Sequence, residues 1–209
     1  MTTLYWDVDT QADFMRSDGR LYVPGAESII RNLQRLTIQA HRLGITIVAS
    51  ADDHQPEHAE LSEAPDYVHT FPPHCMRGTP GQLKLRETVL TDPVVLEPEA
   101  LPLHQLASMV RAHRGDWLLH KHRFDVFTNA NARPLLQLLA PDRIVLYGVA
   151  TDVCNKAAVE GIRRWWRRAD LWLVTDAMRG IHTDASEALL AAWAADGARL
   201  VTTDDVCAA

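Results

Sequence analysis

The sequence predicts an α/β protein built on one open, parallel β-sheet of six strands. Short apolar runs alternate with longer amphipathic segments along the chain, which is typical of a parallel sheet whose strands are joined by helices. Several of these runs are apolar throughout, as strands covered on both faces require. The 209 residues, of which 47% are hydrophobic, contain no repeat or linker-like change in composition. We therefore expect a single domain that spans residues 1–209.

Each element follows from the local pattern of apolar residues. The predicted strands are Thr3–Val8, Ile45–Ser50, Trp117–His120, Arg143–Val149, Asp170–Thr175 and Arg199–Thr202. Helices are predicted where Leu and Ile recur every three or four residues, as Ile29, Leu33 and Leu36 do. The predicted helices are Gly25–Leu43, His104–His113, Arg133–Leu139, Asp152–Arg168 and Asp184–Asp196. Gly44 and Gly197 stand where helix C-caps belong.

Composition excludes several classes of partner. With 21 Lys and Arg against 27 Asp and Glu, the net charge is −6, so the chain offers no positive field for nucleic acid. No apolar run approaches the roughly 18 residues that cross a bilayer, so we expect no membrane association. Asp7 and Asp9 argue against a signal peptide, and three cysteines are too few for a disulfide framework. We therefore expect a cytoplasmic protein.

A long irregular segment, about residues 52–98, lies between the second and third predicted strands and carries four histidines. A loop of this length inside a compact domain is usually functional or disordered. Ligands of open α/β sheets bind at the carboxyl ends of the strands, so the residues that follow the strands are the candidates for chemistry. These residues are Asp9, Asp52 with His54, Lys121, Cys154 and Asp176.

Cys154 is the strongest candidate nucleophile. Residues 148–154 (GVATDVC) pass from an apolar strand through a turn of small residues into a helix, which places the thiol in the first helical turn. There the helix dipole and the free backbone N–H groups favour a thiolate and can hold an oxyanion. The alternative is a buried structural thiol. The arginines at the other end of this helix, Arg163, Arg164, Arg167 and Arg168, are interpreted as helix capping and solvated surface.

Asp9 is the candidate base for this thiol, because it ends the first predicted strand. The alternative for Asp9 is an ordinary loop carboxylate or a helix cap. Lys121 directly follows the predicted strand Trp117–His120, where it could pair with a carboxylate and orient it. Its alternative is a solvated surface lysine.

The histidines form a second group of candidates. Asp52, His54 and the more distant His74 offer one carboxylate and two imidazoles, a set that suits Zn²⁺, Fe²⁺ or Mn²⁺ with positions left open. His58 follows His54 closely, and Cys75 is either a further ligand or a bystander. Spacing alone is a weak signal, since many His-bearing loops are merely polar. Five of the other histidines are assigned to surface or structure: His41, His113, His120, His122 and His182.

Four motifs distributed along the chain closely resemble those of the isochorismatase-like cysteine hydrolases, and among them the nicotinamidases. They are residues 9–14 (DTQADF), 71–75 (FPPHC), 78–81 (GTPG) and 148–154 (GVATDVC). The resemblance implies a three-layer α/β/α sandwich around a six-stranded parallel sheet. It implies a catalytic triad at Asp9, Lys121 and Cys154. It also implies a cis peptide before Ala150 and an oxyanion hole made by the backbone N–H groups of Ala150 and Cys154.

The same resemblance implies that Asp52, His54 and His74 bind a divalent metal ion, for which we expect zinc, with iron and manganese as alternatives. We expect Phe14, Phe71 and Ala150 to contact the substrate. The expected reaction is hydrolysis of nicotinamide to nicotinate and ammonia, a step of NAD salvage, in an enzyme that forms a homo-oligomer.

Three other functions are weighed against nicotinamide hydrolysis. The first is the same chemistry on another small amide, ureide or carbamoyl compound. The second is a non-catalytic binding module, since a fold does not guarantee a function; the three retained triad residue types argue against it. The third is a vinyl-ether hydrolase resembling isochorismatase itself, against which Cys154 counts.

Overall fold

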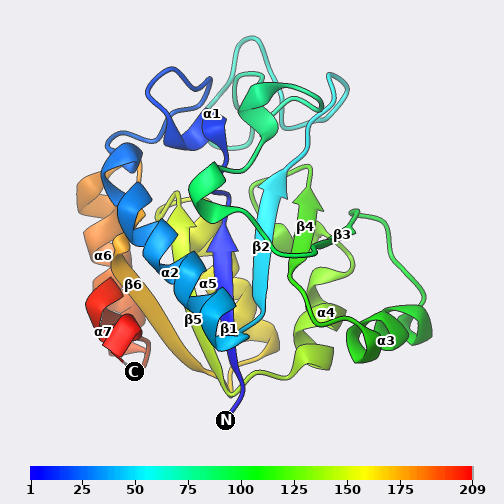
Figure 1. The fold of residues 1–209 in the computed structure, drawn as a ribbon. Coiled ribbons are helices and arrows are strands. Elements are labelled where there is room, and N and C mark those ends of the chain that lie inside the picture. The colour runs from blue at the N-terminus through cyan, green and yellow to red at the C-terminus, as the bar shows by residue number, and fades with distance from the viewer. Residues whose placement is uncertain (209) are drawn as a thin grey trace.

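The computed structural model describes residues 1–208, whose sheet has seven parallel strands in the order β3-β4-β2-β1-β5-β6-β7 (Figure 1). The strands are β1 Thr3–Val8, β2 Ile47–Asp52, β3 Val94–Leu96, β4 Trp117–Lys121, β5 Arg143–Val149, β6 Asp170–Arg179 and β7 Arg199–Val201. Every neighbouring pair is parallel. The prediction of an α/β fold on a parallel sheet is confirmed.

The predicted number of six strands is wrong, because β3 lies inside the segment that we expected to be irregular. Its three residues, Val94–Leu96, pair with Trp117–Leu119 of β4 at one edge of the sheet. A run of three apolar residues is too short for a periodic signal. This strand is therefore defined by its pairing with β4 and not by a pattern in its own sequence.

The helices are α1 Ala12–Met15, α2 Ile30–Leu43, α3 Leu103–Ala112, α4 Ala132–Leu139, α5 Cys154–Trp165, α6 Thr183–Ala195 and α7 Thr203–Ala208. The five predicted helices correspond to α2 to α6, and the short helices α1 and α7 were not predicted. Short 3₁₀ turns occupy Ala26–Ile29, Pro80–Gln82, Arg86–Thr88 and Val126–Thr128. Within residues 1–208, none of the helices has the length and apolarity needed to cross a membrane.

Helices cover both faces of the sheet, so the molecule has three layers. Leu4 and Trp6 of β1 face a core to which α5 contributes Val159, and α3, α4 and α6 pack on the same side. Tyr5 points to the opposite face, where α2 contributes Leu33 and α7 also packs. Figure 1 shows α2 in front of the sheet and α5 behind it. The alternation of side chains along β1 thus divides the interior into two cores.

The connecting loops gather at the carboxyl ends of β1, β2 and β4, away from the two termini (Figure 1). At this edge β5 and β1 approach one another at Gly148, whose φ is +118°. A Cβ atom at Gly148 would lie 2.1 Å from the carbonyl oxygen of Val8. Only glycine allows this approach, which brings the chain after β5 next to Asp9.

Candidate active site

Four adjacent strands bring the candidate residues to one edge of the sheet. Asp52 and Lys121 are the last residues of β2 and β4 and are partners in the strand register. Asp9 directly follows β1, and Cys154 begins α5 after the turn that follows β5. Because β4, β2, β1 and β5 are consecutive in the sheet, four side chains that are distant in sequence converge.

Lys121 lies at the centre of this group and is fully buried. Its Nζ is 3.0 Å from Asp9 Oδ2 and 3.9 Å from Cys154 Sγ, and it also forms an ion pair with Asp52. Burial alone would lower the pKa of Lys121, but the charges of Asp52 and Asp9 exceed this effect and raise it well above the ordinary value. The lysine therefore remains a cation that joins two buried carboxylates.

Asp9 has the properties of a proton acceptor. Burial raises the pKa of Asp9, and the charge of Lys121 opposes the shift without cancelling it. Ser50 Oγ donates a hydrogen bond of 2.6 Å to Asp9 Oδ1. One carboxyl oxygen is thus held by Ser50 and the other by Lys121, which fixes the orientation of the carboxyl group.

Cys154 is buried, and burial raises the pKa of its thiol well above the ordinary value. Lys121 acts in the opposite direction, but its effect is smaller. Any preference of the helix start for a thiolate is outweighed in this environment, because desolvation of the charged sulfur is the largest effect on the pKa. The thiol needs a base, and a hydrogen bond with Asp9 is among the causes of its raised pKa.

The backbone before α5 has the form that the resemblance implies. The peptide bond between Val149 and Ala150 is cis. The carbonyl oxygen of Ala150 accepts hydrogen bonds of 3.0 Å from the N–H groups of Val153 and Asn155. Within the described part of the chain, the N–H groups of Ala150 and Cys154 donate no hydrogen bond. Two backbone donors near the thiol therefore remain free for a ligand oxygen.

Asp52, His54, Glu60 and His74 form a buried group in which one potential ligand atom from each residue lies within 4.8 Å of the others. Both ring nitrogens of His54 are buried without a hydrogen-bond partner. Burial lowers the pKa of His54 to about 3, so its ring is neutral. A buried, neutral imidazole without a hydrogen-bond partner, next to a carboxylate, fits a divalent metal ion, which would satisfy one of its ring nitrogens.

His74 is oriented by its other ring nitrogen. Its Nδ1 lies 2.7 Å from the carbonyl oxygen of Pro72 and donates to it, while Nε2 lies 3.3 Å from Asp52 Oδ2. Burial alone would lower the pKa of His74, but its hydrogen bond to Asp52 and the charge of that residue raise it. The pKa of Asp52 is lowered, since Lys121 and His74 outweigh burial. A metal ion at this group would replace the proton on His74 Nε2.

Glu60 is a member of this group that the sequence analysis missed. Burial and the charge of Asp52 raise the pKa of Glu60 to about 7. The available signal was an acidic residue six positions after His54 in the same loop. Ser50 was also missed; it is the single hydroxyl side chain of β2, two positions before Asp52.

The two residues left open as further ligands lie beside His54: the ring centroid of His58 is 5.6 Å from that of His54, and the backbone N–H of His54 donates to the carbonyl oxygen of Cys75 at 3.1 Å. His58 stacks on His122, with ring centroids 3.8 Å apart. Cys75 is buried in the core on the α2 side of the sheet, and its backbone N–H donates to Asp13 Oδ2 at 2.7 Å. Among residues 1–208, neither His58 nor Cys75 belongs to the group around His54.

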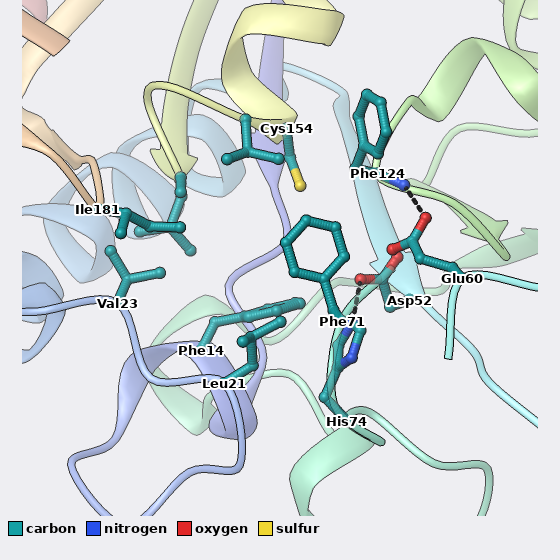
Figure 2. A pocket seen from close by; sticks show the side chains of 13 residues that line it. Phe14, Leu21, Val23, Asp52, Glu60, Phe71, His74, Phe124, Cys154 and Ile181 are labelled. Atoms are coloured by element: carbon teal, nitrogen blue, oxygen red, sulfur yellow. Dashed lines mark hydrogen bonds and ion pairs between the residues drawn. The ribbon is translucent and has the colours of Figure 1, made fainter. Parts of the chain in front are cut away.

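A cavity connects the thiol to the group around Asp52. It is lined by Phe14, Leu21, Val23, Asp52, Glu60, Phe71, His74, Phe124, Val149, Ala150, Val153, Cys154 and Ile181. Phe14, Phe71 and Ala150 therefore lie where contact with a ligand was expected. Figure 2 shows Cys154 on one side of the cavity and Asp52, Glu60 and His74 on another, with the ring of Phe71 between them. An elongated flat molecule could contact both ends.

Comparison with known proteins gives consistent matches over most of the chain. The family model described as the isochorismatase domain matches residues 7–205. The nicotinamidase/pyrazinamidase of Mycobacterium tuberculosis is 27% identical over 189 residues, which cover 88% of this chain and 89% of that protein.

Two solved structures are also similar in fold. The pyrazinamidase of Pyrococcus horikoshii in complex with zinc has a TM-score of 0.72 at 22% identity and covers 97% of this chain and 99% of its own. The N-carbamoylsarcosine amidase of Thermoplasma acidophilum has a TM-score of 0.72 at 21% identity, with 98% of each chain covered. At this level of identity, these likenesses concern the fold.

Proposed function

Since the chain belongs to the isochorismatase family of hydrolases, we propose that it is an amidohydrolase that converts nicotinamide to nicotinate and ammonia through a thioester on Cys154. One observation carries this proposal. A single cavity has the Cys154 thiol at one end and three members of the donor set for a divalent ion, Asp52, Glu60 and His74, at the other. Nicotinamide matches both ends, because its carboxamide and its ring nitrogen lie at different positions of one flat ring.

In the proposed mechanism, Asp9 accepts the proton of the Cys154 thiol and the sulfur attacks the carboxamide carbon. The backbone N–H groups of Ala150 and Cys154 stabilise the oxyanion of the tetrahedral intermediate. Asp9 then gives its proton to the departing nitrogen, so ammonia leaves and a thioester remains. Finally Asp9 takes a proton from a water molecule whose oxygen attacks the thioester, and it returns that proton to the departing sulfur, so nicotinate is released and both the thiol and the Asp9 carboxylate are regenerated.

Lys121 supports this proton transfer by holding Asp9. Its ammonium group contacts the Asp9 carboxylate at 3.0 Å and lies 3.9 Å from the sulfur. The cation stabilises the negative charge that passes between oxygen and sulfur as the proton moves. Its second ion pair, with Asp52, connects this pair to the group around His54.

Asp52, His54, Glu60 and His74 would hold the divalent ion. When bound, the ion supplies an electrophilic position for the pyridine nitrogen of the substrate. Zinc is our first choice, since two imidazoles and carboxylates form a donor set that it commonly accepts and since the structurally similar pyrazinamidase of P. horikoshii is a zinc complex. Iron and manganese suit the same donors.

The cavity wall favours an uncharged aromatic amide. Phe14, Phe71 and Phe124 line it together with aliphatic side chains. Among the described residues that line the cavity, none is lysine or arginine. A carbamoyl compound with a free carboxylate would find no lysine or arginine in this lining, so only the proposed ion could offset its charge, and an unpaired buried charge is costly.

A second candidate is hydrolysis of another small amide, ureide or carbamoyl compound. It is favoured by the fold likeness to the N-carbamoylsarcosine amidase, which equals the likeness to the zinc-bound pyrazinamidase in TM-score. The discriminating experiment measures ammonia release from nicotinamide, benzamide and N-carbamoyl amino acids, before and after chelation. Metal-dependent release that is fastest with nicotinamide supports the first proposal. Faster release from a carbamoyl compound would establish the second candidate.

A further inference from the structure

Glu60 accepts hydrogen bonds from two residues that form walls of the cavity, one through its side chain and one through its backbone. Its carboxyl Oε2 accepts a hydrogen bond of 2.7 Å from the backbone N–H of Phe124. Its backbone carbonyl oxygen accepts another of 2.7 Å from the N–H of Phe71. Both phenylalanines line the cavity. Figure 2 shows the dashed contact between Glu60 and Phe124, with Phe71 facing the interior.

Phe71 and Phe124, which form these two walls, both lie outside the helices and strands. Phe71 lies in the long loop between β2 and β3, where an isolated bridge pairs it with Leu61. Phe124 lies in the bend between β4 and the 3₁₀ turn Val126–Thr128. Neither residue belongs to a helix or a strand of the sheet, so hydrogen bonds to the backbone, together with packing of the side chains, hold each ring in place.

Glu60 itself is held firmly enough to serve as an anchor. The residue is only 1% exposed. A buried carboxyl group is stable only where its oxygens are paired, and one of them is paired with the Phe124 N–H. The carboxyl group also belongs to the cluster with Asp52, His54 and His74. One residue therefore connects this cluster to both aromatic walls.

We propose that Glu60 is a positioning residue that fixes Phe71 and Phe124 around the ring of an aromatic amide, and so selects for flat aromatic substrates. This role rests on the proposed amidohydrolase function and is separate from any contact of Glu60 with a metal ion. The Phe124 bond uses the side chain, so it can be removed by substitution. The Phe71 bond uses the backbone and survives substitution, so it provides an internal reference.

The test compares Glu60→Ala with Glu60→Gln in the metal-loaded protein. Glutamine keeps an oxygen that can accept from the Phe124 N–H, whereas alanine does not. We expect Glu60→Ala to raise KM about tenfold for both nicotinamide and benzamide, in line with loss of one hydrogen bond to a carboxylate, with kcat changed much less. Glu60→Gln should restore KM for benzamide to within about threefold of the original protein.

Two further measurements separate this role from a ligand role. Hydrogen exchange of the backbone amides around Phe124 should accelerate in Glu60→Ala and return toward the original rate in Glu60→Gln. Exchange around Phe71 should change much less. Phe124→Ala should raise KM to a similar extent, and Glu60→Ala should add little to it, because both substitutions remove the same wall. Metal content is measured for each variant.

Three outcomes would overturn the proposal. The first is unchanged exchange at Phe124 in Glu60→Ala. The second is a loss of metal in both Glu60 variants with KM raised for nicotinamide alone, which would make Glu60 a ligand only. The third is accelerated exchange without any change in KM for either amide. If the original protein released no ammonia from any aromatic amide, the proposed amidohydrolase function would be wrong. The exchange rates would still test whether the Glu60 carboxyl group holds the Phe124 backbone.

Discussion

Ser50 and Asp9 are joined across two neighbouring strands by a hydrogen bond of 2.6 Å between Ser50 Oγ and Asp9 Oδ1. Both residues are fully buried. Asp9 therefore receives one neutral and one cationic donor, from Ser50 and Lys121, and both stabilise its charged form. Burial acts against that charge and dominates, so the net shift of the Asp9 pKa is upward.

Ser50→Ala should raise the pKa of Asp9 further, because it removes a hydrogen bond to the charged form. A carboxyl group with a higher pKa is protonated over a wider acidic range, and only the deprotonated form accepts the thiol proton. We expect the acidic limb of the kcat/KM profile to move to higher pH, by about one unit. Ser50→Thr, which keeps a hydroxyl, is the matched control. If the acidic limb of the profile did not move in Ser50→Ala, Asp9 would not be the base whose protonation limits activity at low pH.

Cys154→Ala should abolish nicotinamide hydrolysis while leaving the fold intact. Only the sulfur is lost, and alanine is favourable at a helix start that has no side-chain cap hydrogen bond. Lys121 keeps both of its carboxylate partners. Ammonia release and the midpoint of thermal unfolding are the measurements, with Cys75→Ser as the control for loss of a buried thiol. Activity above a few per cent in Cys154→Ala would contradict a thioester mechanism.

Lys121→Met should reduce both activity and stability. It leaves the buried carboxylates of Asp9 and Asp52 without their cation, a change that costs about 3 to 5 kcal/mol in comparable buried pairs. Turnover should fall by roughly 10² or more, because the orientation of the base is lost. Denaturant unfolding and steady-state kinetics test the two effects. Adding Asp52→Asn should recover part of the stability without the activity, and wild-type turnover in Lys121→Met would refute the Asp9–Lys121 pair.

His54→Ala should lower metal content and raise KM for nicotinamide, since His54 presents ring nitrogens with no other partner. Benzamide lacks the ring nitrogen but keeps the carboxamide, so it should be a poorer substrate and only modestly affected by the same change. The measurements are the metal content and KM for both amides. The double variant His54→Ala/His74→Ala should bind less metal than His54→Ala alone. Equal turnover of benzamide and nicotinamide by metal-loaded protein would favour the general amide hydrolase.

Gly148→Ala should destabilise the fold strongly. The new Cβ would lie 2.1 Å from the Val8 carbonyl oxygen, in a residue with φ of +118°. Gly44→Ala is the matched control, because Gly44 also has a positive φ but no heavy atom lies within 4 Å of its Cβ position. We expect about 1 to 2 kcal/mol for the control and more than about 3 kcal/mol for Gly148→Ala, measured by denaturant unfolding.

The sequence by itself determined the α/β class and the approximate positions of its longer elements. Runs such as Arg143–Val149 and the helical periodicity of Ile30–Leu43 carry their own structural signal, because burial of a strand or of one helix face requires those patterns. The sequence also placed Asp9, Asp52 and Lys121 at strand ends, where the strand order could bring them together. It did not reveal β3, which is too short to have a pattern.

Tertiary structure alone decided the properties that make these residues reactive. The raised pKa of Asp9 and the protonated state of Cys154 result from burial by neighbours that are distant in sequence. Ser50 and Glu60 join the site through contacts across strands and loops, to Asp9 and Phe124. Local sequence specifies which backbone conformation a segment prefers, whereas desolvation and hydrogen-bond partners depend on which segments the fold brings into contact.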